Sequence, residues 1–380
     1  SFSKGYYDLD GQTGGGPGNW TRGHGFEFTS SAGSNINYIS IASGTSNIFV
    51  RHAYFNEIGN TELTISGATG VYNSGDLNDS LFEYLYFDNL GGLPFLLRNG
   101  KNNTIQYSYS GNICGMSVAD INWHCEAIVI HDMDDINFRW NYINECPSSG
   151  GFVKNNFQNS DSVRIYGNIF ANGFPINCNT GTCTNWIIYN NVFENLRGGP
   201  VGGDGGFDAT NQIKNNIIYN ASAISGFRGT HDFNWYSRIQ EASCSMNAAQ
   251  NENVMTRYPD YCDIINETRG PFVAASNFHL ISALPGAALS APFNLDMDGD
   301  ARGSDGNWDI GAYEYSNLTI SIIPGDVNSD GKVGMADLQL VAADFGKAGG
   351  FDSRVDLAEP YNLINLYDIM VVVKNWGRTA

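Results

Sequence analysis

The chain has 380 residues, and its 20 Lys and Arg against 39 Asp and Glu give a formal net charge of −19. Such a surface repels nucleic acid and anionic membranes and favours divalent cations. Only 16% of the residues are charged, which argues against long helices with salt-bridged faces, whereas 45 glycines and 13% aromatic residues favour short strands joined by tight turns. No apolar run is long enough for a membrane-spanning helix.

The first 45 residues are rich in glycine and aromatic residues and contain two strand-like stretches, FEFTSS and NYISIAS. No basic and apolar leader begins the sequence, so we expect Ser1 to be a processed N-terminus. The segment has no amphipathic helix, and we predict that residues 1–45 form an N-terminal cap or arm.

From residue 46 onward an apolar pattern recurs at intervals of roughly 23 to 33 residues. It has two columns that lie five residues apart. The first holds Val50, Phe82, Ile105, Phe138, Ile165, Ile188 and Ile213, and the second holds Phe55, Phe87, Ser110, Ile143, Phe170, Phe193 and Ile218. The units alternate as strands do and are too short for a helix pair, so we predict three short strands and three turns in each unit.

Asparagine recurs in two further columns. One holds Asn141, Asn168, Asn191 and Asn216, and the other holds Asn89, Asn112, Asn172, Asn195 and Asn220. Asparagine accepts the left-handed backbone of tight turns, and identical amides in successive layers can hydrogen-bond to one another. We interpret both columns as structural.

With this repeat, residues 46–316 resemble the secreted right-handed parallel β-helix proteins of the broad pectate-lyase-like group. Their last part, LDMDGDARGSDGNWDIGAYEY (295–315), is similar to the D-x-D-G-x-x-R…DIGAYE signature that closes many bacterial β-helix domains. The resemblance implies an all-β fold, a right-handed parallel β-helix solenoid. It does not fix the activity, because the group includes lyases, glycosidases, adhesins and structural fibres.

The acidic residues of the closing signature are Asp296, Asp298, Asp300, Asp305 and Asp309. They surround Arg302, which we expect to pair with a carboxylate in a structural role. A second calcium ion at this place is the alternative, although Ala301 stands where a calcium loop would have glycine.

The richest polar stretch is HCEAIVIHDMDD, whose ionisable residues are His124, Glu126, His131, Asp132, Asp134 and Asp135. A glycosidase needs two carboxyl groups, for which Glu126 and Asp134 are candidates. A lyase needs a base beside a charge neutraliser, for which Arg139 or Lys154 could act with Asp132 and Asp134. Consecutive acidic residues more often form a solvated turn, so Glu126, Asp134 and Arg139 are candidates only.

A further column follows the first apolar column by one residue and is predicted to face outward. It holds Arg51, Glu83, Gln106, Arg139, Tyr166, Tyr189 and Lys214. Tyrosine and arginine in a row could contact sugar rings, although tyrosine is also an ordinary strand residue.

Seven cysteines without a CxxC pair favour disulfides in a secreted protein over a zinc or redox site. By sequence proximity, the predicted pairs are Cys178 with Cys183 and Cys244 with Cys262. Six N-x-S/T sequons also fit secretion, although an Asn-rich chain produces such motifs by chance. The candidate glycosylation sites are Asn19, Asn78, Asn102, Asn220, Asn266 and Asn317.

After a strand-like linker (317–324), the stretch GDVNSDGKVGMADLQLVAADFG resembles the first half of a dockerin module, an EF-hand-type loop followed by one helix. The resemblance implies a calcium-binding module over residues 325–380. Its Ca²⁺ ligands would be Asp326, Asn328 and Asp330, the carbonyl of Lys332, and Asp337 at the twelfth loop position.

The second half of this module, VDLAEPYNLINLYDIMVVVKNWG (355–377), keeps the helix pattern but lacks the ligand pattern. Ala358 and Pro360 stand where ligands would lie, so we expect one Ca²⁺ rather than two. In dockerins the exposed helix faces bind a partner, and a folded cap without a partner is the alternative.

Together these features predict a secreted structural or adhesive protein of the extracellular space or cell surface, stabilised by calcium. We expect it to assemble head to tail into filaments, or to dock onto an extracellular protein, through residues 325–380. The alternatives are a polysaccharide lyase or glycoside hydrolase and a non-catalytic glycan-binding protein. Neither nucleic acid binding nor a membrane span is expected.

Overall fold

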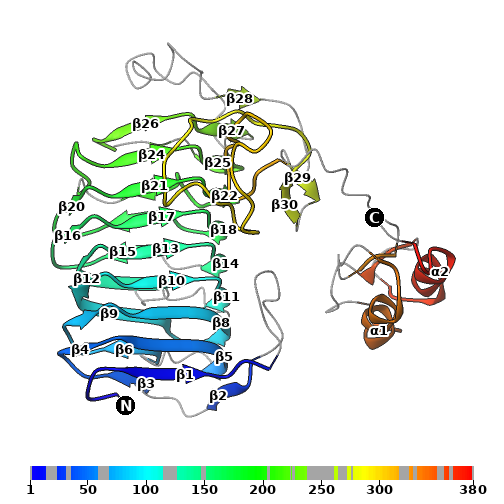
Figure 1. Cartoon of the computed structure of the whole chain (residues 1–380), viewed down its shortest axis with the longest axis horizontal. Coiled ribbons are helices and arrows are strands. Elements are labelled where there is room, and N and C mark those ends of the chain that lie inside the picture. The colour runs from blue at the N-terminus through cyan, green and yellow to red at the C-terminus, as the bar shows by residue number, and fades with distance from the viewer. Residues whose placement is uncertain are drawn as a thin grey trace. The chain divides into compact units, whose positions relative to one another are not determined.

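The computed structural model describes residues 2–13, 24–30, 36–58, 68–113, 126–146, 151–202, 206–222, 224, 227–237, 261–263, 272–274, 277–315, 325–327, 332–348, 355–358 and 363–378. The chain divides into two compact units, Ser1–Tyr315 and Ser316–Ala380. The first unit is all-β with long parallel sheets, and the second, called the tail here, contains two short helices in its described part (Figure 1).

One sheet of the first unit contains two parallel runs of strands, stacked in chain order (Figure 1). The first run consists of β1 (Tyr7–Asp10), β5 (Ile48–Ile58), β8 (Leu81–Leu90), β10 (Thr104–Gln106), β13 (Asn137–Arg139), β17 (Arg164–Tyr166), β21 (Ile187–Tyr189), β24 (Gln212–Lys214) and β26 (Thr230–Asp232). Their register pairs Val50 with Phe82, Phe82 with Ile105, and so on to Ile213. The register therefore confirms the first apolar column.

The second run shares β5 and β8 with the first. Its other strands are β2 (Phe26–Ser30), β11 (Tyr109–Ile113), β14 (Tyr142–Cys146), β18 (Ile169–Gly173), β22 (Val192–Glu194), β25 (Ile217–Tyr219), β27 (Trp235–Ser237) and β28 (Tyr261–Asp263). Their register confirms the second apolar column from Phe55 to Ile218. Between the two runs the chain bends at one left-handed residue in each layer, such as Tyr84 with φ 54°.

A second parallel sheet lies in the same unit. It contains β3 (Asn37–Ile41), β4 (Thr45–Ser46), β6 (Thr69–Asn73), β7 (Leu77–Asn78), β9 (Leu93–Lys101), β12 (Ile128–Asp134), β15 (Val153–Asn155), β19 (Ile176–Cys178) and β23 (Val201–Gly202). Two small pairs accompany the sheets, β16 (Ser160–Asp161) with β20 (Cys183–Thr184) and β29 (Phe272–Ala274) with β30 (Asn277–Leu280). We call the layered strands of the first unit the strand stack.

The core of the strand stack draws apolar side chains from both sheets into one buried cluster. Phenylalanine rings stack from layer to layer, with ring centroids 4.8 Å apart for Phe28 and Phe55, and 4.5 Å for Phe55 and Phe87. Full burial of each such side chain contributes about 2 kcal/mol. The columns recur in the sequence because each layer must present a matching ring to the next.

A ladder of buried asparagines runs along the bend between the two runs. Asn168 Nδ2 donates to the carbonyl oxygens of Phe138 (2.9 Å) and Tyr166 (3.1 Å), and its Oδ1 accepts from the backbone N–H of Asn141 (2.9 Å). Asn141, Asn191, Asn216 and Asn234 repeat the arrangement. The amides thus supply hydrogen bonds to peptide groups that have no strand partner at the bend. The predicted layer-to-layer stacking of these asparagines is confirmed.

Residues 1–45 do not stand apart as an arm where they are described. β1 pairs in parallel with β5, β2 pairs with β5, and β3 pairs with β6. These strands form the first layer of the strand stack. The alternating pattern of FEFTSS and NYISIAS is the sequence signal, because one apolar side of such a strand packs on the next layer.

Beyond β30, the segment 281–315 runs irregularly over the outer side of both runs of strands in their later layers (Figure 1). Its apolar residues form a second buried cluster with outward side chains of the stack. The ring of Phe293 lies edge-on to Tyr166 and Tyr189, with centroids 4.9 and 5.1 Å away. We call this part of the chain the closing segment.

The tail packs helix α1 (Met335–Ala343) against helix α2 (Leu366–Lys374) around a small core of its own. The core contains Val327, Val333, Val341, Val355, Ile364 and Val372. A left-handed glycine follows each helix three residues after its last residue, Gly346 (φ 84°) after α1 and Gly377 (φ 78°) after α2.

Candidate functional site

The Glu126 carboxylate lies just before β12 and is 1% exposed. Its Oε1 is 3.0 Å from Nζ of Lys154, which is also buried, on β15. His124 of the same sequence stretch lies outside the described residues. A carboxylate held by a buried lysine is not presented to a polymer at the surface.

Asp134 lies at the other end of β12. It follows Ile128 by six positions, which corresponds to at most about 20 Å of extended strand. The side chain is exposed, and its Oδ1 accepts a hydrogen bond from the backbone N–H of Asp161 (2.9 Å). Asp134 and Glu126 therefore do not form the pair of facing carboxyl groups that a glycosidase needs.

Arg139, the third candidate, belongs to β13 in the other sheet. Its Nε donates to Gln106 Oε1 (2.8 Å), and Nη1 donates to the hydroxyl of Tyr166 (2.9 Å). Gln106 donates in turn to Glu83 (2.6 Å). The predicted outward column is thus a hydrogen-bonded row along the stack, and Arg139 is one member of it.

The left-handed bend residues beside this row are aromatic in four layers. His52 stacks on Tyr84 with centroids 4.7 Å apart, Tyr84 on Tyr107 at 5.4 Å, and Tyr107 on Trp140 at 5.0 Å. All four have φ between 47° and 54°. Since a non-glycine residue costs about 1 kcal/mol in this conformation, the stacking must offset that cost.

A row of tyrosines runs parallel to the bend on the second run of strands. It contains Tyr54, Tyr86, Tyr109 and Tyr142, with neighbouring centroids 5.0, 4.8 and 5.4 Å apart. Burial raises the pKa of Tyr86 and Tyr142 well above the ordinary value, and it raises that of Tyr107 to about 12. These hydroxyls therefore remain protonated and can donate hydrogen bonds at any physiological pH.

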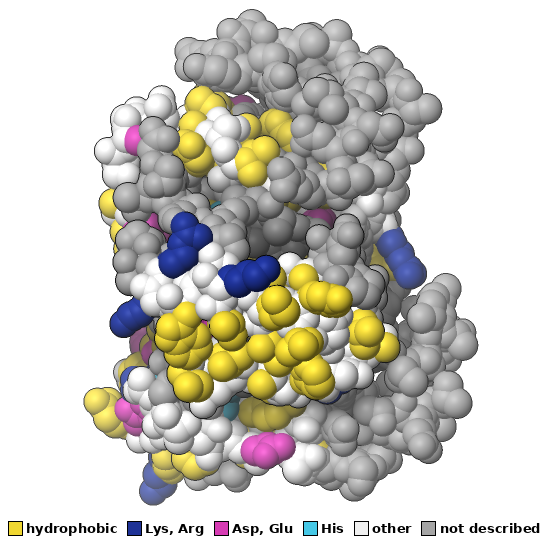
Figure 2. Space-filling model, turned by 90° about the vertical axis from the view of Figure 1, so that its right-hand side faces the viewer, with side chains coloured by type: hydrophobic (Ala, Val, Ile, Leu, Met, Phe, Trp, Pro, Cys, Tyr) yellow, Lys and Arg dark blue, Asp and Glu magenta, His cyan; other side chains and the backbone are white. Residues whose placement is uncertain are grey.

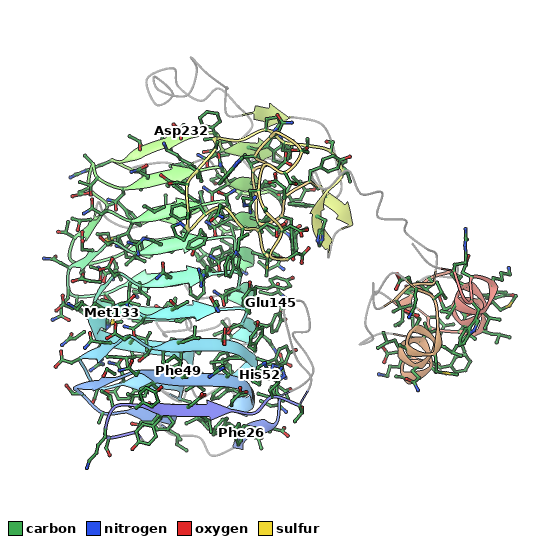
Figure 3. All side chains as sticks on the ribbon, viewed as in Figure 1. Phe26, Phe49, His52, Met133, Glu145 and Asp232 are labelled. Atoms are coloured by element: carbon green, nitrogen blue, oxygen red, sulfur yellow. A yellow bond between two sulfur atoms is a disulfide. The ribbon has the colours of Figure 1, made fainter. Side chains whose placement is uncertain are left out.

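His52 carries the most unusual polar group of this face. It lies at the bend of β5 (Figure 3), is 4% exposed, and its Nδ1 is 2.8 Å from Asp10 Oδ1. Burial alone raises the pKa of Asp10, but the hydrogen bonds from His52 and Gln12 and the charge of Arg51 lower it overall. The carboxylate thus stays charged and orients the imidazole.

Three buried nitrogen atoms of this face find no hydrogen-bond partner within the described structure: Arg51 Nε, His52 Nε2 and Trp140 Nε1. We call the face that holds them, together with the aromatic and tyrosine rows, the outer face. Arg51 Nε and Trp140 Nε1 carry N–H groups, whereas His52 Nε2 is the acceptor nitrogen of a neutral ring whose Nδ1 donates to Asp10. All three atoms are buried, so a sugar would reach them only after neighbouring side chains move. The rings stack on one another, so the face offers hydroxyls and ring edges rather than open ring planes.

The closing segment covers the outer face in the later layers. There Arg302 is fully buried, donates to the carbonyl oxygens of Asp309 (3.0 Å) and Gly311 (2.9 Å), and pairs with Glu314 at 3.6 Å. Oδ1 of Asp296 accepts the backbone N–H groups of Asp298 and Asp300. The predicted pairing of Arg302 with a carboxylate is therefore observed. The residues of the closing signature form these contacts with one another and so stabilise their own loop.

The predicted calcium loop is described only in part, because Asn328 and Asp330 lie outside the described residues. The Asp337 carboxylate is buried and reaches back to the loop, accepting from the backbone N–H of Val327 (2.7 Å) and of Gly334 (2.7 Å). A buried carboxylate supplies the hard oxygen atoms that Ca²⁺ prefers, so this part fits Ca²⁺. Within the described ranges, no three His, Cys, Asp or Glu side chains gather at one point.

The second half of the tail also contains a buried aspartate that accepts hydrogen bonds from its loop, although this loop lacks the calcium-ligand pattern. The Asp368 carboxylate is buried and accepts from the backbone N–H groups of Leu357 (2.7 Å), Ala358 (2.9 Å) and Asn365 (2.8 Å). Asp368 follows Asp337 by 31 residues, as α2 follows α1. Backbone donors therefore satisfy this carboxylate within the described part of the loop.

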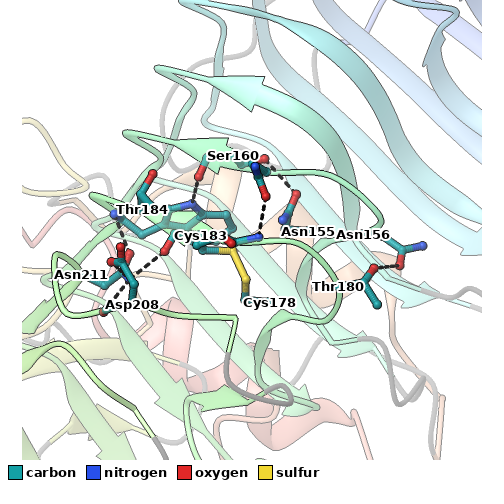
Figure 4. Close-up of a disulfide and its surroundings, with 12 residues drawn as sticks. Asn155, Asn156, Ser160, Cys178, Thr180, Cys183, Thr184, Asp208 and Asn211 are labelled. Atoms are coloured by element: carbon teal, nitrogen blue, oxygen red, sulfur yellow. Dashed lines mark hydrogen bonds between the residues drawn. A yellow bond between two sulfur atoms is a disulfide. The ribbon is translucent and has the colours of Figure 1, made fainter.

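The structure contains the Cys178–Cys183 disulfide, which lies beside the loop that links β19 to β20 (Figure 4). Cys244 lies outside the described residues, as do the sequon asparagines Asn19, Asn266 and Asn317. At Asn220 the amide nitrogen donates to Asn195 Oδ1 (2.7 Å). Asn220 is thus part of the second asparagine column, whose side chains hydrogen-bond from layer to layer and which we call the outer ladder.

The amide nitrogen of Asn102 donates to Asp79 (2.7 Å), and the side-chain oxygen of Asn78 accepts from the backbone N–H of Lys101 (3.0 Å). Asn102 is exposed and Asn78 is half-buried. Of the three described sequon asparagines, Asn102 is therefore the most exposed.

Sequence reasoning missed His52, Asp10 and the tyrosine row. The available signal was the repeat itself: His52, Tyr84, Tyr107 and Trp140 each follow the outward column by one residue. The partner Asp10 gave no such signal, because it precedes the first recognised unit.

A scan against protein-family models gives no match for this chain, and a search of curated proteins gives none either. Across the part of the chain that the structure describes, the helices are too short or too polar to cross a membrane.

Proposed function

We propose that this is an extracellular structural or adhesive protein, in which the strand stack is a right-handed parallel β-helix and the tail is a calcium-stabilised, dockerin-like docking module. The stack would act as a rigid arm, and the tail would attach it to another copy or to a partner protein. The in-register columns of the two runs of strands, together with the second parallel sheet, support the β-helix. The disulfide and the sequons agree with secretion.

The observation that carries the docking role is the apolar surface of the tail. Thirteen large hydrophobic side chains of the described residues are exposed, and the small tail holds eight of them: Met335, Phe345, Leu363, Leu366, Tyr367, Met370, Val373 and Trp376. Figure 2 shows a face of the molecule on which hydrophobic side chains gather in one patch, with Lys and Arg side chains beside it. Exposed apolar patches of this kind mark protein interaction sites.

Calcium would be held by Asp326, Asn328, Asp330, the Lys332 carbonyl and Asp337. Its charge would neutralise the carboxylates of the loop and fix the start of α1. The tail residues would then present their apolar side chains in one arrangement, which lowers the entropy cost of binding a partner.

Sedimentation of the full chain with Ca²⁺, with EDTA, and with Leu366→Asp or Val373→Asp tests this role. We expect calcium-dependent association, or calcium-dependent capture of an extracellular protein, that the two substitutions abolish. Gln339→Asp, on the exposed side of α1, is the matched control and should leave association intact. Association that persists unchanged with EDTA and in the Asp variants would refute the docking role.

The second candidate function is glycan binding or cleavage on the outer face. The row of protonated tyrosine hydroxyls, next to three buried nitrogen atoms without a hydrogen-bond partner in the described structure, favours it. A screen of neutral and acidic polysaccharides for binding and for new reducing or unsaturated ends tests it. His52→Phe and Asp10→Asn should abolish either signal, whereas Asp134→Asn, at a distant edge, should not. If no polysaccharide binds at millimolar concentration, this candidate fails.

A further inference from the structure

A lysine and an asparagine lie side by side on one face of the second sheet. Lys154 of β15 is the register partner of Asn177 of β19, and the two strands are parallel. Neighbouring strands lie about 4.8 Å apart, and register partners in a parallel pair project to the same side. The Lys154 side chain is therefore long enough for its Nζ to reach the carboxamide carbon of Asn177.

The surroundings of this pair are largely shielded from solvent. Glu126, 3.0 Å from Lys154 Nζ, is 1% exposed, and Lys154 is 8% exposed. Val129, the register partner of Lys154 on β12, is 2% exposed. Desolvation penalises both members of a buried ion pair, and transfer of one proton from lysine to glutamate removes both charges.

The amide of Asn177 is itself incompletely satisfied. Its Oδ1 is buried and has no hydrogen-bond partner within the described structure. Burying a carbonyl oxygen without a donor costs about 1–3 kcal/mol. Glu126, which contacts Lys154, could donate to this oxygen once it has taken the proton from the lysine, and so polarise the carbon for attack.

We propose that Lys154 and Asn177 are joined by an intramolecular isopeptide bond, with Glu126 as the proton carrier. Nζ of neutral Lys154 attacks Cγ of Asn177, and protonated Glu126 delivers its proton toward the amide. The Cγ–Nδ2 bond then breaks, Nδ2 leaves as ammonia, and Glu126 recovers a proton from Nζ. One amine and one carboxamide thus become one secondary amide and one ammonia, with no oxidant or cofactor.

The bond would connect two successive layers of the strand stack. Cys178, next to Asn177, is already cross-linked to Cys183, so this part of the stack would carry two covalent links. The proposal concerns the stack alone and does not depend on the docking or glycan-binding roles.

Intact-mass measurement of the reduced full chain tests the bond. We expect a mass lower than that of the sequence by one ammonia, and a branched peptide after proteolysis that joins the segments of Lys154 and Asn177. Lys154→Arg, Asn177→Ala and Glu126→Gln should each show the full mass. Glu126→Gln is the sharpest of the three, because both reacting groups remain. Asn179→Ala, two residues along the same segment, should keep the ammonia deficit.

Circular dichroism of each variant shows that it is folded, so that a missing bond is not a consequence of unfolding. A folded wild-type chain with the full mass and no branched peptide would overturn the proposal. Loss of water with a peptide that joins Lys154 to Glu126 would overturn the assignment of Asn177. Formation of the bond in Glu126→Gln would remove Glu126 from the reaction.

Discussion

Asn168 shows how one buried side chain can hold two layers of the stack. Its amide satisfies two carbonyl oxygens, and its oxygen accepts a backbone N–H of the previous layer. The recurrence of asparagine at the layer spacing reveals such a residue in the sequence. The particular bonds depend on the bend that brings these peptide groups around it.

Asn168→Ala should lower the free energy of unfolding of the strand stack by about 3 kcal/mol, because it leaves buried peptide groups without partners. Denaturant unfolding measures the difference. Asn172→Ala, in the exposed outer ladder, is the control and should cost about 1 kcal/mol, mostly for its left-handed backbone. Equal effects at the two positions would contradict this account.

Glu194 on β22 is the described carboxyl group on which burial has the clearest effect. Burial raises its pKa from 4.5 to about 7, and the side chain is 8% exposed. A raised pKa in the folded state means that the folded protein holds its proton more tightly than the unfolded chain. Stability from this group is therefore fully present below pH 4.5 and is lost as the pH rises toward about 7.

Glu194→Gln should remove this loss. Relative to wild type, the variant should gain stability between pH 5 and pH 7.5, by up to about 3 kcal/mol. Melting temperatures across this range measure the gain. Asp161→Asn, at an exposed layer edge, should show no gain of this kind, and a Glu194→Gln difference that is flat with pH would contradict the burial of the carboxyl group.

At the scale of the element, both helices of the tail begin in the same way, with a buried aspartate in their first turn. The third residue of each helix is this aspartate, Asp337 in α1 and Asp368 in α2. Its carboxylate accepts hydrogen bonds from backbone N–H groups of the preceding loop. The sequence predicts both helices from their apolar pattern. It does not reveal that Asp368 is satisfied by backbone donors, since its loop lacks any ligand pattern.

Asp368→Asn should destabilise the tail by about 2 kcal/mol with or without calcium, because fewer loop N–H groups find a charged acceptor. Asp337→Asn should instead remove the difference between calcium and EDTA. Melting of the tail in both conditions, followed by calorimetry, distinguishes the two variants. A calcium-dependent effect of Asp368→Asn would mean that the second half also binds the ion.

At the scale of the whole molecule, the chain consists of two units with separate cores. Residues of the tail core do not belong to either buried cluster of the strand stack. Each unit should therefore unfold by itself. The closing segment, by contrast, belongs to the first unit, because its apolar residues share a cluster with the stack.

A chain that ends at residue 315 should keep the melting temperature of the strand stack within about 2 °C and lose the calcium-dependent transition. Differential scanning calorimetry of the full and shortened chains measures both. A further truncation before Phe293 should lower the melting temperature of the stack, because it uncovers Tyr166 and Tyr189. A large shift on loss of the tail alone would contradict the independence of the units.

The sequence by itself determined the layer spacing, the two apolar columns, the asparagine ladders, the calcium-loop pattern and the two tail helices. These features follow from local rules, since a layered strand must repeat its inward residues and a loop must carry its ligands at fixed positions. Only the tertiary structure decided which polar residues meet. It placed Asp10 against His52 and Lys154 beside Asn177, and it kept Glu126 and Asp134 apart, because contacts between layers depend on register and bends rather than on proximity along the chain.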